Sequence, residues 1–352
     1  MCPTLFHLPW LGLPIRGYGL MLMVAFLGGT WWAAHRAARV KADPDLVVNL
    51  GFLALIASVV GARVFYVAHY WERFAGRGLW DIVNVAAGGL EFYGGFLGAV
   101  AAILIYMHLK KVSIRLYLDI VTPSLMFGMA AARIGCFLNG CCWGAPCDPN
   151  LAWGVQFPYG SPAQYRQWEE RQMTLPQEIL IQDPLNPLTM VPVLPEFVEL
   201  QKKARAKQAA SQPDQTAAVA ALANYQRLMN LPEHKSLRVH PVQLYSSMDG
   251  LLLAILLSAI FYRRKRHGVV FGWLLLLYPL CRVVEEIIRI DNPHDTAGLT
   301  ISQFVSLALL TCGVLWLVAM YRLPIRSPLA VPYVPPDLEP SRANKGRSAK
   351  RK

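Results

Sequence analysis

The sequence has 352 residues, of which 55% are hydrophobic and only 16% charged, and its net charge is +12. This balance lies outside the range of soluble globular domains. The apolar residues form long blocks without period-two alternation, which excludes an outer-membrane barrel and indicates a helical membrane protein. Positive charge gathers at the ends of the apolar blocks, so it indicates membrane topology, and no nucleic acid partner is expected.

Seven apolar blocks are long enough to cross a hydrocarbon layer of roughly 30 Å, which takes about 20 helical residues. In chain order they span 18–34, 46–68, 89–108, 118–138, 244–262, 269–288 and 300–321. The sequence therefore predicts an all-α polytopic membrane protein with seven transmembrane helices.

Lysine and arginine follow the first, third, fifth and seventh blocks, that is, every second connection. Because basic connections stay on the cytoplasmic side, this pattern predicts an N-terminus outside and a C-terminus in the cytoplasm. The chain then divides into transmembrane helices 1–4 (1–140), an external, periplasmic insert (141–239), transmembrane helices 5–7 (240–322) and a disordered basic cytoplasmic tail (323–352). The insert is expected to form a small cap of mixed structure.

Several polar residues fall inside the predicted helices, near their outer ends. Such residues are costly in a membrane and tend to be functional. They are Tyr18, Glu91, Tyr93, Arg133, Asn139, His240, Gln243, Tyr245, Tyr278, Arg282, Glu285 and Glu286. Because the topology brings them to one level, we expect a polar cavity open to the outer half of the membrane.

Arg133 and Arg282 are the most costly residues of this set. Arg282 lies four residues before Glu286, which puts both on one helical face. One interpretation is an intramembrane ion pair that holds helices together, with Arg133 extending to the membrane interface. The functional interpretation is a phosphate clamp, because guanidinium groups bind phosphate in a bidentate way and stay charged. A phospholipid head group is the natural phosphate at this depth.

Two further motifs each have a structural and a functional interpretation. Gly94 and Gly95 follow Tyr93, and such glycines indicate either close helix packing or a helix end whose N–H groups face an anion. His240 precedes a proline suited to a first helical turn, so it is either a capping residue or, with Gln243, a residue that orients a head group.

Four cysteines, Cys136, Cys141, Cys142 and Cys147, form the cysteine cluster of this sequence. A disulfide of Cys141 or Cys142 with Cys147 would suit an oxidising compartment. Buried packing cysteines are the second interpretation, and a metal or redox site is the third. A single Cys-x4-Cys spacing is weak evidence for a metal, so no metal is expected.

Five motifs, in order along the chain, resemble those of the prolipoprotein diacylglyceryl transferase family. They are IRGYGLM (15–21), GGLEFYGG (88–95), RIGCFLNGCCWG (133–144), HPVQLY (240–245) and YPLCRVVEEIIR (278–289). With the seven predicted helices they cover the chain from about residue 15 to residue 321. The ordered set is specific, whereas none of the motifs would suffice alone.

The resemblance implies a reaction and a location. The family transfers the diacylglyceryl group of phosphatidylglycerol to the thiol of the lipobox cysteine of a preprolipoprotein, so that a thioether forms and glycerol phosphate leaves. It implies a multi-pass protein of the bacterial inner (plasma) membrane whose partners are phosphatidylglycerol, the lipobox peptide and membrane lipids. It implies no metal, nucleotide or other cofactor.

The resemblance also implies residue roles. Arg133 and Arg282 would stabilise negative charge on the departing phosphate, and Glu286 would orient Arg282. Tyr93 would form a hydrogen bond at the site, and it could accept the thiol proton only if its pKa of about 10 were lowered. Residues expected to bind substrate are Tyr18, Gly94, Gly95, Asn139, Gly144, His240, Gln243 and Tyr278.

The chain departs from the family pattern at three positions. The family usually has Asn in place of Cys136, Glu in place of Cys141 and Glu in place of Ser246. Glu91 and Glu285 are additional carboxylates that would compensate for the loss. The alternatives are a paralogous membrane protein that binds or transports lipid and a membrane thiol-redox protein that uses the cysteine cluster.

Overall fold

A computed structural model describes most of the chain: residues 4–7, 14–76, 78–85, 88–182, 190–193, 227–288 and 300–334. Most of the external insert after residue 193 and the tail after residue 334 lie outside the described residues. The prediction of a disordered basic tail and part of the predicted cap of mixed structure therefore fall outside this part of the chain.

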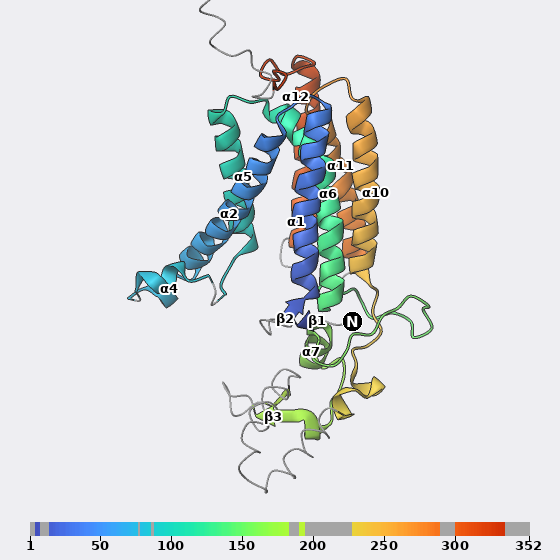
Figure 1. The fold of residues 1–352 in the computed structure, drawn as a ribbon. Coiled ribbons are helices and arrows are strands. Elements are labelled where there is room, and N and C mark those ends of the chain that lie inside the picture. The colour runs from blue at the N-terminus through green and yellow to red at the C-terminus, as the bar shows by residue number, and fades with distance from the viewer. Residues whose placement is uncertain are drawn as a thin grey trace, which may run out of the picture. The chain divides into compact units, whose positions relative to one another are not determined.

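Each predicted apolar block coincides with a long helix (Figure 1). The helices are α1 (Gly17–Arg39), α2 (Pro44–His69), α5 (Phe92–Leu109), α6 (Ile114–Asn139), α10 (Val242–Arg263), α11 (Val269–Ile288) and α12 (Ile301–Arg322). Within the described residues, six helices are long and apolar enough to cross a membrane, and α11, which carries Arg282, Glu285 and Glu286, is not among them. The all-α polytopic membrane class is confirmed, and a count of seven spans stays a prediction.

The remaining described elements are short. Helices α3 (Trp71–Phe74) and α4 (Leu79–Val83) follow α2, and the external insert holds α7 (Pro162–Glu169) with the 3-10 helices η1 (Gln177–Ile179) and η3 (Pro232–His234). Strand β1 (Thr4–His7) pairs with β2 (Pro14–Arg16), and β3 (Leu180–Gln182) pairs with β4 (Met190–Pro192), both antiparallel.

The chain forms two compact units. The first unit contains residues 1–25, 129–251 and 278–308, and the second contains residues 26–128, 252–277 and 309–352. This division passes through the long helices α1, α6, α10, α11 and α12 and not between them. The predicted domain boundaries at residues 140, 239 and 322 therefore stay predictions.

In the second unit, α2 and α5 pack through glycines (Figure 1). A Cβ on Gly94 would collide with Phe65, and a Cβ on Gly95 would lie 2.9 Å from the carbonyl oxygen of Ser58. A Cβ on Gly98 would lie 2.8 Å from a carbonyl oxygen of α2. Because small residues let helix backbones approach closely in a membrane, these glycines fix the α2–α5 contact.

Arg36 is a fully buried arginine of the second unit. Its Nη1 donates hydrogen bonds to the carbonyl oxygen of Ile120 (2.6 Å) and to Oγ of Ser124 (3.2 Å). Its guanidinium also lies 4.8 Å from the ring centre of Trp32 and 5.5 Å from that of Phe261. A buried arginine is tolerated because hydrogen bonds and aromatic faces replace its hydration.

Arg63, on α2, organises the segment that leads into α5. Its Nε donates to the carbonyl oxygen of Ile82 (2.7 Å), and its Nη2 donates to that of Asp81 (2.6 Å). Its Nη1 donates to the carbonyl oxygens of Gly88 (2.8 Å) and Gly89 (3.0 Å). One side chain thus binds two carbonyl oxygens in the last turn of α4 and two in the loop before α5.

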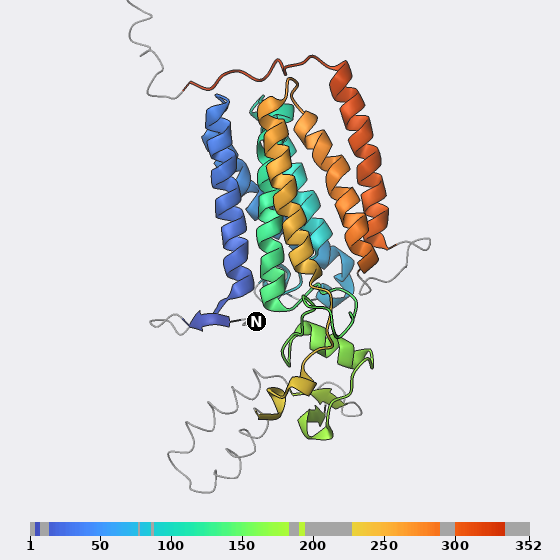
Figure 2. The same cartoon turned by 90° about the vertical axis from the view of Figure 1, so that its right-hand side faces the viewer.

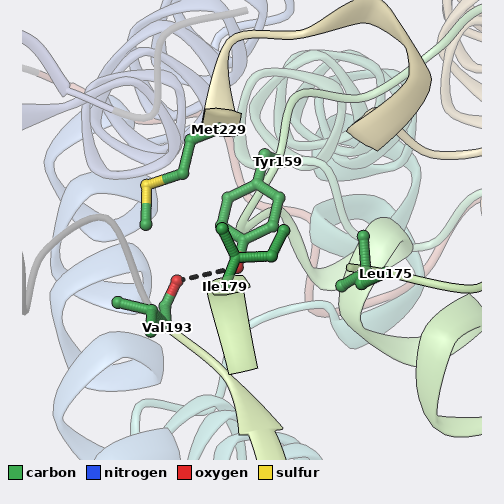
Figure 3. Packing of buried hydrophobic residues seen from close by; sticks show 5 residues of the cluster. All are labelled: Tyr159, Leu175, Ile179, Val193 and Met229. Carbon is green, nitrogen blue, oxygen red and sulfur yellow. Dashed lines mark hydrogen bonds between the residues drawn. The ribbon is translucent and has the colours of Figure 1, made fainter. Parts of the chain in front are cut away.

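The insert between α6 and α10 has its own small core, which belongs to the first unit (Figure 2). Tyr159, Leu175, Ile179, Val193 and Met229 pack against one another (Figure 3). The Tyr159 hydroxyl donates a hydrogen bond of 3.0 Å to the carbonyl oxygen of Val193. The described part of the insert is therefore a packed structure and not an open loop.

Candidate active site

Arg133, on α6 in the first unit, is half-buried and lies within electrostatic reach of Tyr18 and Glu285. Among the described residues its guanidinium forms no hydrogen bond and no ion pair within 4 Å. A half-buried guanidinium without such a partner retains its donors for a ligand. Arg133 is therefore the residue of this unit best suited to receive an anion.

Arg282, on α11, is held by its own helix, as its spacing predicts. Its Nη2 lies 2.7 Å from Oε2 of Glu286, and its Nη1 lies 3.5 Å from Oε2 of Glu285. Nη1 is buried and has no hydrogen bond within the described residues. The ion pair therefore fixes one side of the guanidinium, and the other side keeps donor capacity.

Glu286 connects α11 to α12. Its Oε1 accepts a hydrogen bond of 2.8 Å from the hydroxyl of Thr300. The hydroxyl of Thr300 also accepts from the backbone N–H of Gln303, whose side chain accepts from the backbone N–H of Thr300. This is a capping box, and the spacing Thr-x-x-Gln before an apolar run was a sequence signal for it. Thr300 thus supports the site through Glu286, although it is absent from the polar residues predicted from the sequence.

Glu285 is a second carboxylate at the predicted clamp, 3.5 Å from Nη1 of Arg282. It is buried, lies beside Ser246 and is within electrostatic reach of Arg133, Arg282 and Asp249. Ser246 occupies a position at which the resemblance implies a glutamate. A carboxylate is therefore present beside that position, although a different helix supplies it.

The two ends of the external insert are joined next to α10. The N–H of Gly144 donates to the carbonyl oxygen of His240 (3.0 Å), and the N–H of His240 donates to that of Ala145 (3.0 Å). A Cβ on Gly144 would lie 2.9 Å from the same His240 oxygen, so only glycine allows this approach. Nε2 of the buried Gln243 donates to the carbonyl oxygen of Cys141 (2.7 Å). Gly144, His240 and Gln243 thus connect the segment that follows α6 to the segment at the start of α10.

Three other predicted residues of the first unit lie at the edges of this group. Tyr278 is half-buried on α11, one turn before Arg282. Nδ1 of His240 lies 3.4 Å from the hydroxyl of Tyr245. Asn139 is the last residue of α6, and its side chain contacts the thiol of Cys141. Each of these side chains keeps some exposed surface.

Tyr93, Gly94 and Gly95 belong to the second unit. Tyr93 is half-exposed in the first turn of α5, and the two glycines face α2. The close-packing interpretation of the glycines therefore has direct geometric support. Glu91, just before α5, belongs to the second unit, and its Oε1 lies 2.6 Å from Nδ1 of His69.

The cysteine cluster divides into two parts. None of its four members is in a disulfide bond. The sulfur atoms of Cys136, Cys141 and Cys142 all lie within 4.8 Å of one another. Cys147 lies instead beside Gly154. The interpretation of a disulfide to Cys147 thus has no support in the structure.

Two cavities lie in the second unit. One, of about 430 Å³, is lined by residues of α11 and α12, and another, of about 480 Å³, lies at the connection between α10 and α11. None of the predicted site residues lines either cavity. The candidate site is thus defined by its polar groups.

These features define a multi-span helical membrane protein with two arginines and two buried carboxylates in one compact unit. A model of the prolipoprotein diacylglyceryl transferase family matches residues 3–319. Proteins named phosphatidylglycerol–prolipoprotein diacylglyceryl transferase from Ralstonia pickettii and Erwinia tasmaniensis are 29% and 27% identical to the chain. These alignments cover 88% of the chain in both cases, and 91% and 89% of the relatives.

A relative of the same name from Rhodopirellula baltica is 38% identical over 154 residues, which are 43% of the chain and 31% of that protein. The match of the family model extends through all seven long helices as far as residue 319, in the last turns of α12. The chain belongs to the prolipoprotein diacylglyceryl transferase family.

Proposed function

We propose that the chain is a transferase that moves the diacylglyceryl group of phosphatidylglycerol to the cysteine thiol of a prolipoprotein. Two facts support this: membership of the family, and the pairing of the uncommitted Arg133 with Arg282 in one unit. The second is the observation that carries the mechanism, because the reaction expels a phosphate.

The reaction forms one bond and breaks another. The sulfur of the substrate cysteine attacks the glycerol carbon that carries the phosphate, a C–S bond forms, and the C–O bond to the phosphate breaks. Glycerol phosphate leaves with the electron pair of that bond, and the proton of the thiol passes to the departing phosphate or to water. Negative charge develops on the phosphate oxygens, and we assign its stabilisation to Arg133 and to Nη1 of Arg282.

The two carboxylates have different proposed roles. Glu286 holds Arg282 through Nη2, so that the guanidinium does not need to reorganise when the phosphate arrives. Glu285 supplies, beside Ser246, the negative charge that the family usually carries in helix 5. Glu285 on α11 would then replace the glutamate that the family usually has at the position of Ser246 on α10.

The remaining site residues are proposed to bind the lipid and the peptide. Tyr18 contacts the same region as Arg133, and Asn139 and Tyr278 flank it on α6 and α11. Gly144, His240 and Gln243 hold the chain at the start of α10. Tyr93, Gly94 and Gly95 stay proposed site residues by resemblance alone.

We further propose that the peptide substrate is a lipobox and that the chain lies in the bacterial inner membrane. The basic connections support an N-terminus outside and a C-terminus in the cytoplasm. Fusing a reporter that is active only outside the cytoplasm to each terminus tests this. Activity at the N-terminal fusion alone is expected, and the reverse would contradict the orientation.

The activity is tested in vesicles that contain phosphatidylglycerol labelled in its diacylglycerol part, with a lipobox peptide as acceptor. Transfer of the label to the peptide by a thioether is expected for the full chain and not for Arg133→Ala. Arg166→Ala removes an exposed arginine of the insert and is the matched control. Thioether formation by a variant that lacks both Arg133 and Arg282 would overturn the proposed mechanism.

A further inference from the structure

Three thiols gather at one point of the first unit. The sulfur atoms of Cys136, Cys141 and Cys142 lie within 4.8 Å of one another, and none is in a disulfide bond. Cys136 belongs to α6, and the other two follow the end of that helix. The transferase reaction uses the thiol of its substrate, so the proposed function leaves these three groups without a role.

The backbone holds the three thiols together. After α6 ends at Asn139, Gly140 and Cys142 adopt the left-handed region, with φ values of 74° and 60°. The N–H of Cys141 donates to the carbonyl oxygen of Cys136 (3.1 Å), which closes the turn. A left-handed residue at the end of a helix reverses the chain. The reversal brings both later thiols back onto Cys136.

We propose that Cys136, Cys141 and Cys142 form a binding site for a soft, thiophilic cation of the copper(I) type. Metal–thiolate bonds of about 2.3 Å with trigonal geometry place the sulfur atoms about 4 Å apart. The observed cluster needs only a small contraction to reach that spacing. Thiolate ligands select copper(I) and zinc over hard cations.

The composition of the site favours a three-coordinate ion. Within the described residues, no histidine or carboxylate joins the three thiols in the group. Zinc usually takes four protein ligands in a structural site, whereas three sulfur atoms complete the shell of a monovalent copper ion. The ligand set therefore fits copper(I) better than zinc.

A positively charged residue, Arg133, lies on the same helix as Cys136. Arg133 precedes Cys136 by three residues on α6, which puts them on the same side of the helix. Tyr18 lies within electrostatic reach of Arg133 and of all three cysteines. Three thiolates with one monovalent cation carry two net negative charges, and Arg133 is a positively charged residue one helical turn before Cys136 on α6.

The alternative interpretation is that these cysteines only fill space. Cys281 and Cys312 provide the comparison, because each occurs singly in a long helix and neither belongs to the group. A packing role predicts no difference in metal binding between these two residues and the cluster. A site predicts that only the cluster binds.

The test uses the full-length protein in detergent, reduced and free of oxygen, with copper(I) titrated against a competing chelator. One ion per chain is expected, with about three sulfur neighbours at about 2.3 Å by X-ray absorption. Cys136→Ser and the double variant Cys141→Ser/Cys142→Ser are each expected to weaken binding at least about tenfold. Cys281→Ser and Cys312→Ser are the matched controls and should leave the affinity unchanged.

Two results would overturn the proposal: no copper(I) uptake by the reduced protein, or uptake that persists unchanged after alkylation of the three thiols. Thermal unfolding of each variant without metal shows whether it is folded, so weakened binding is not confused with loss of structure. Zinc is titrated in the same way, and tighter binding of zinc than of copper(I) would contradict the three-coordinate assignment. The readout is metal binding, so it is independent of the transferase activity.

Discussion

The two units differ in how many protein partners their arginines have. In the second unit, Arg36 is buried against aromatic rings and hydrogen-bonded, and Arg63 satisfies four carbonyl oxygens. In the first unit, Arg133 forms no hydrogen bond or ion pair with the described residues, and Nη1 of the ion-paired Arg282 has no hydrogen bond there. The first pair replaces hydration with protein contacts, whereas the second keeps donors for something else.

The comparison separates structural from functional charge inside a membrane protein. A buried arginine with most of its donors on protein acceptors, such as Arg36 apart from its buried Nε, is stabilised by the protein and has little left for a ligand. An arginine with donors to spare is costly in the free protein and is best explained by an anionic substrate. The following predictions test this distinction, from the largest expected effect to the smallest.

Replacing Arg133 by alanine is expected to lower the transfer rate by about 10²–10³-fold, as the loss of one transition-state donor does. Because Arg133 has no hydrogen-bond or ion-pair partner among the described residues, the thermal unfolding temperature in detergent should stay close to that of the unchanged protein. The two measurements are the labelled-lipid assay and thermal unfolding. A large drop in unfolding temperature with intact transfer would place Arg133 with the structural arginines.

Replacing Arg36 by methionine is expected to do the reverse. It removes hydrogen bonds from a charged donor, each worth about 1.5–3 kcal/mol, and leaves the carbonyl oxygen of Ile120 without that partner. The unfolding temperature should fall, while the transfer rate per folded molecule stays within about twofold, because the residue belongs to no proposed catalytic group. Selective loss of transfer in a fully stable variant would contradict the structural assignment.

Replacing Glu286 by glutamine is expected to reduce the transfer rate about tenfold, an effect of about 1.4 kcal/mol, because contacting charged groups couple by about 0.5–3 kcal/mol. Glutamine keeps an oxygen for Thr300 but removes the charge that holds Arg282.

Glu170→Gln is the matched control, because Glu170 pairs with Arg166 at the same spacing of four residues, but on an exposed helix. Such exposed pairs contribute little. A loss of transfer in the control as large as in Glu286→Gln would remove the case for a positioning role of Glu286.

The smallest expected effect is on acid stability and involves His267, in the connection between α10 and α11. Burial, with the nearby Arg264, Arg115 and Arg326, lowers the pKa of His267 to about 4. Its Nδ1 accepts a hydrogen bond from the N–H of Ser327 (3.3 Å), which fits a neutral ring.

Because the folded pKa of His267 lies below its ordinary value of 6.5, the unfolded chain binds the proton more tightly. The stabilisation is complete above pH 6.5 and is lost as the pH falls from 6.5 towards 4. Unfolding temperatures measured over this range should decrease less steeply for His267→Asn than for the unchanged protein. Parallel decreases would show that His267 does not contribute.

The sequence predicted the helices closely because membrane-spanning segments have to be long and continuously apolar. It placed a helix at 300–321, and α12 runs from Ile301 to Arg322. It also predicted the Arg282–Glu286 contact, since residues four apart on one helix are always neighbours. Both predictions concern local geometry, which the spacing along the chain fixes.

The contacts of Glu285, Thr300 and Arg133 were decided by tertiary structure. No spacing along the chain shows that Glu285 lies beside Ser246, that Thr300 donates to Glu286, or that Arg133 is without a partner among the described residues. These facts depend on how α6, α10, α11 and α12 pack in the first unit.

The cysteine cluster shows the same division between local and tertiary information. The sequence places Cys141 and Cys142 a few residues after Cys136, but spacing alone left disulfide, packing and metal interpretations open. The left-handed residues Gly140 and Cys142 fold the three thiols together and leave Cys147 beside Gly154. The sequence by itself determined the helices and the residue types of the site, because hydrophobicity and helical periodicity are properties of the chain. The tertiary structure decided which polar groups share partners and which keep donors, because that depends on contacts between helices.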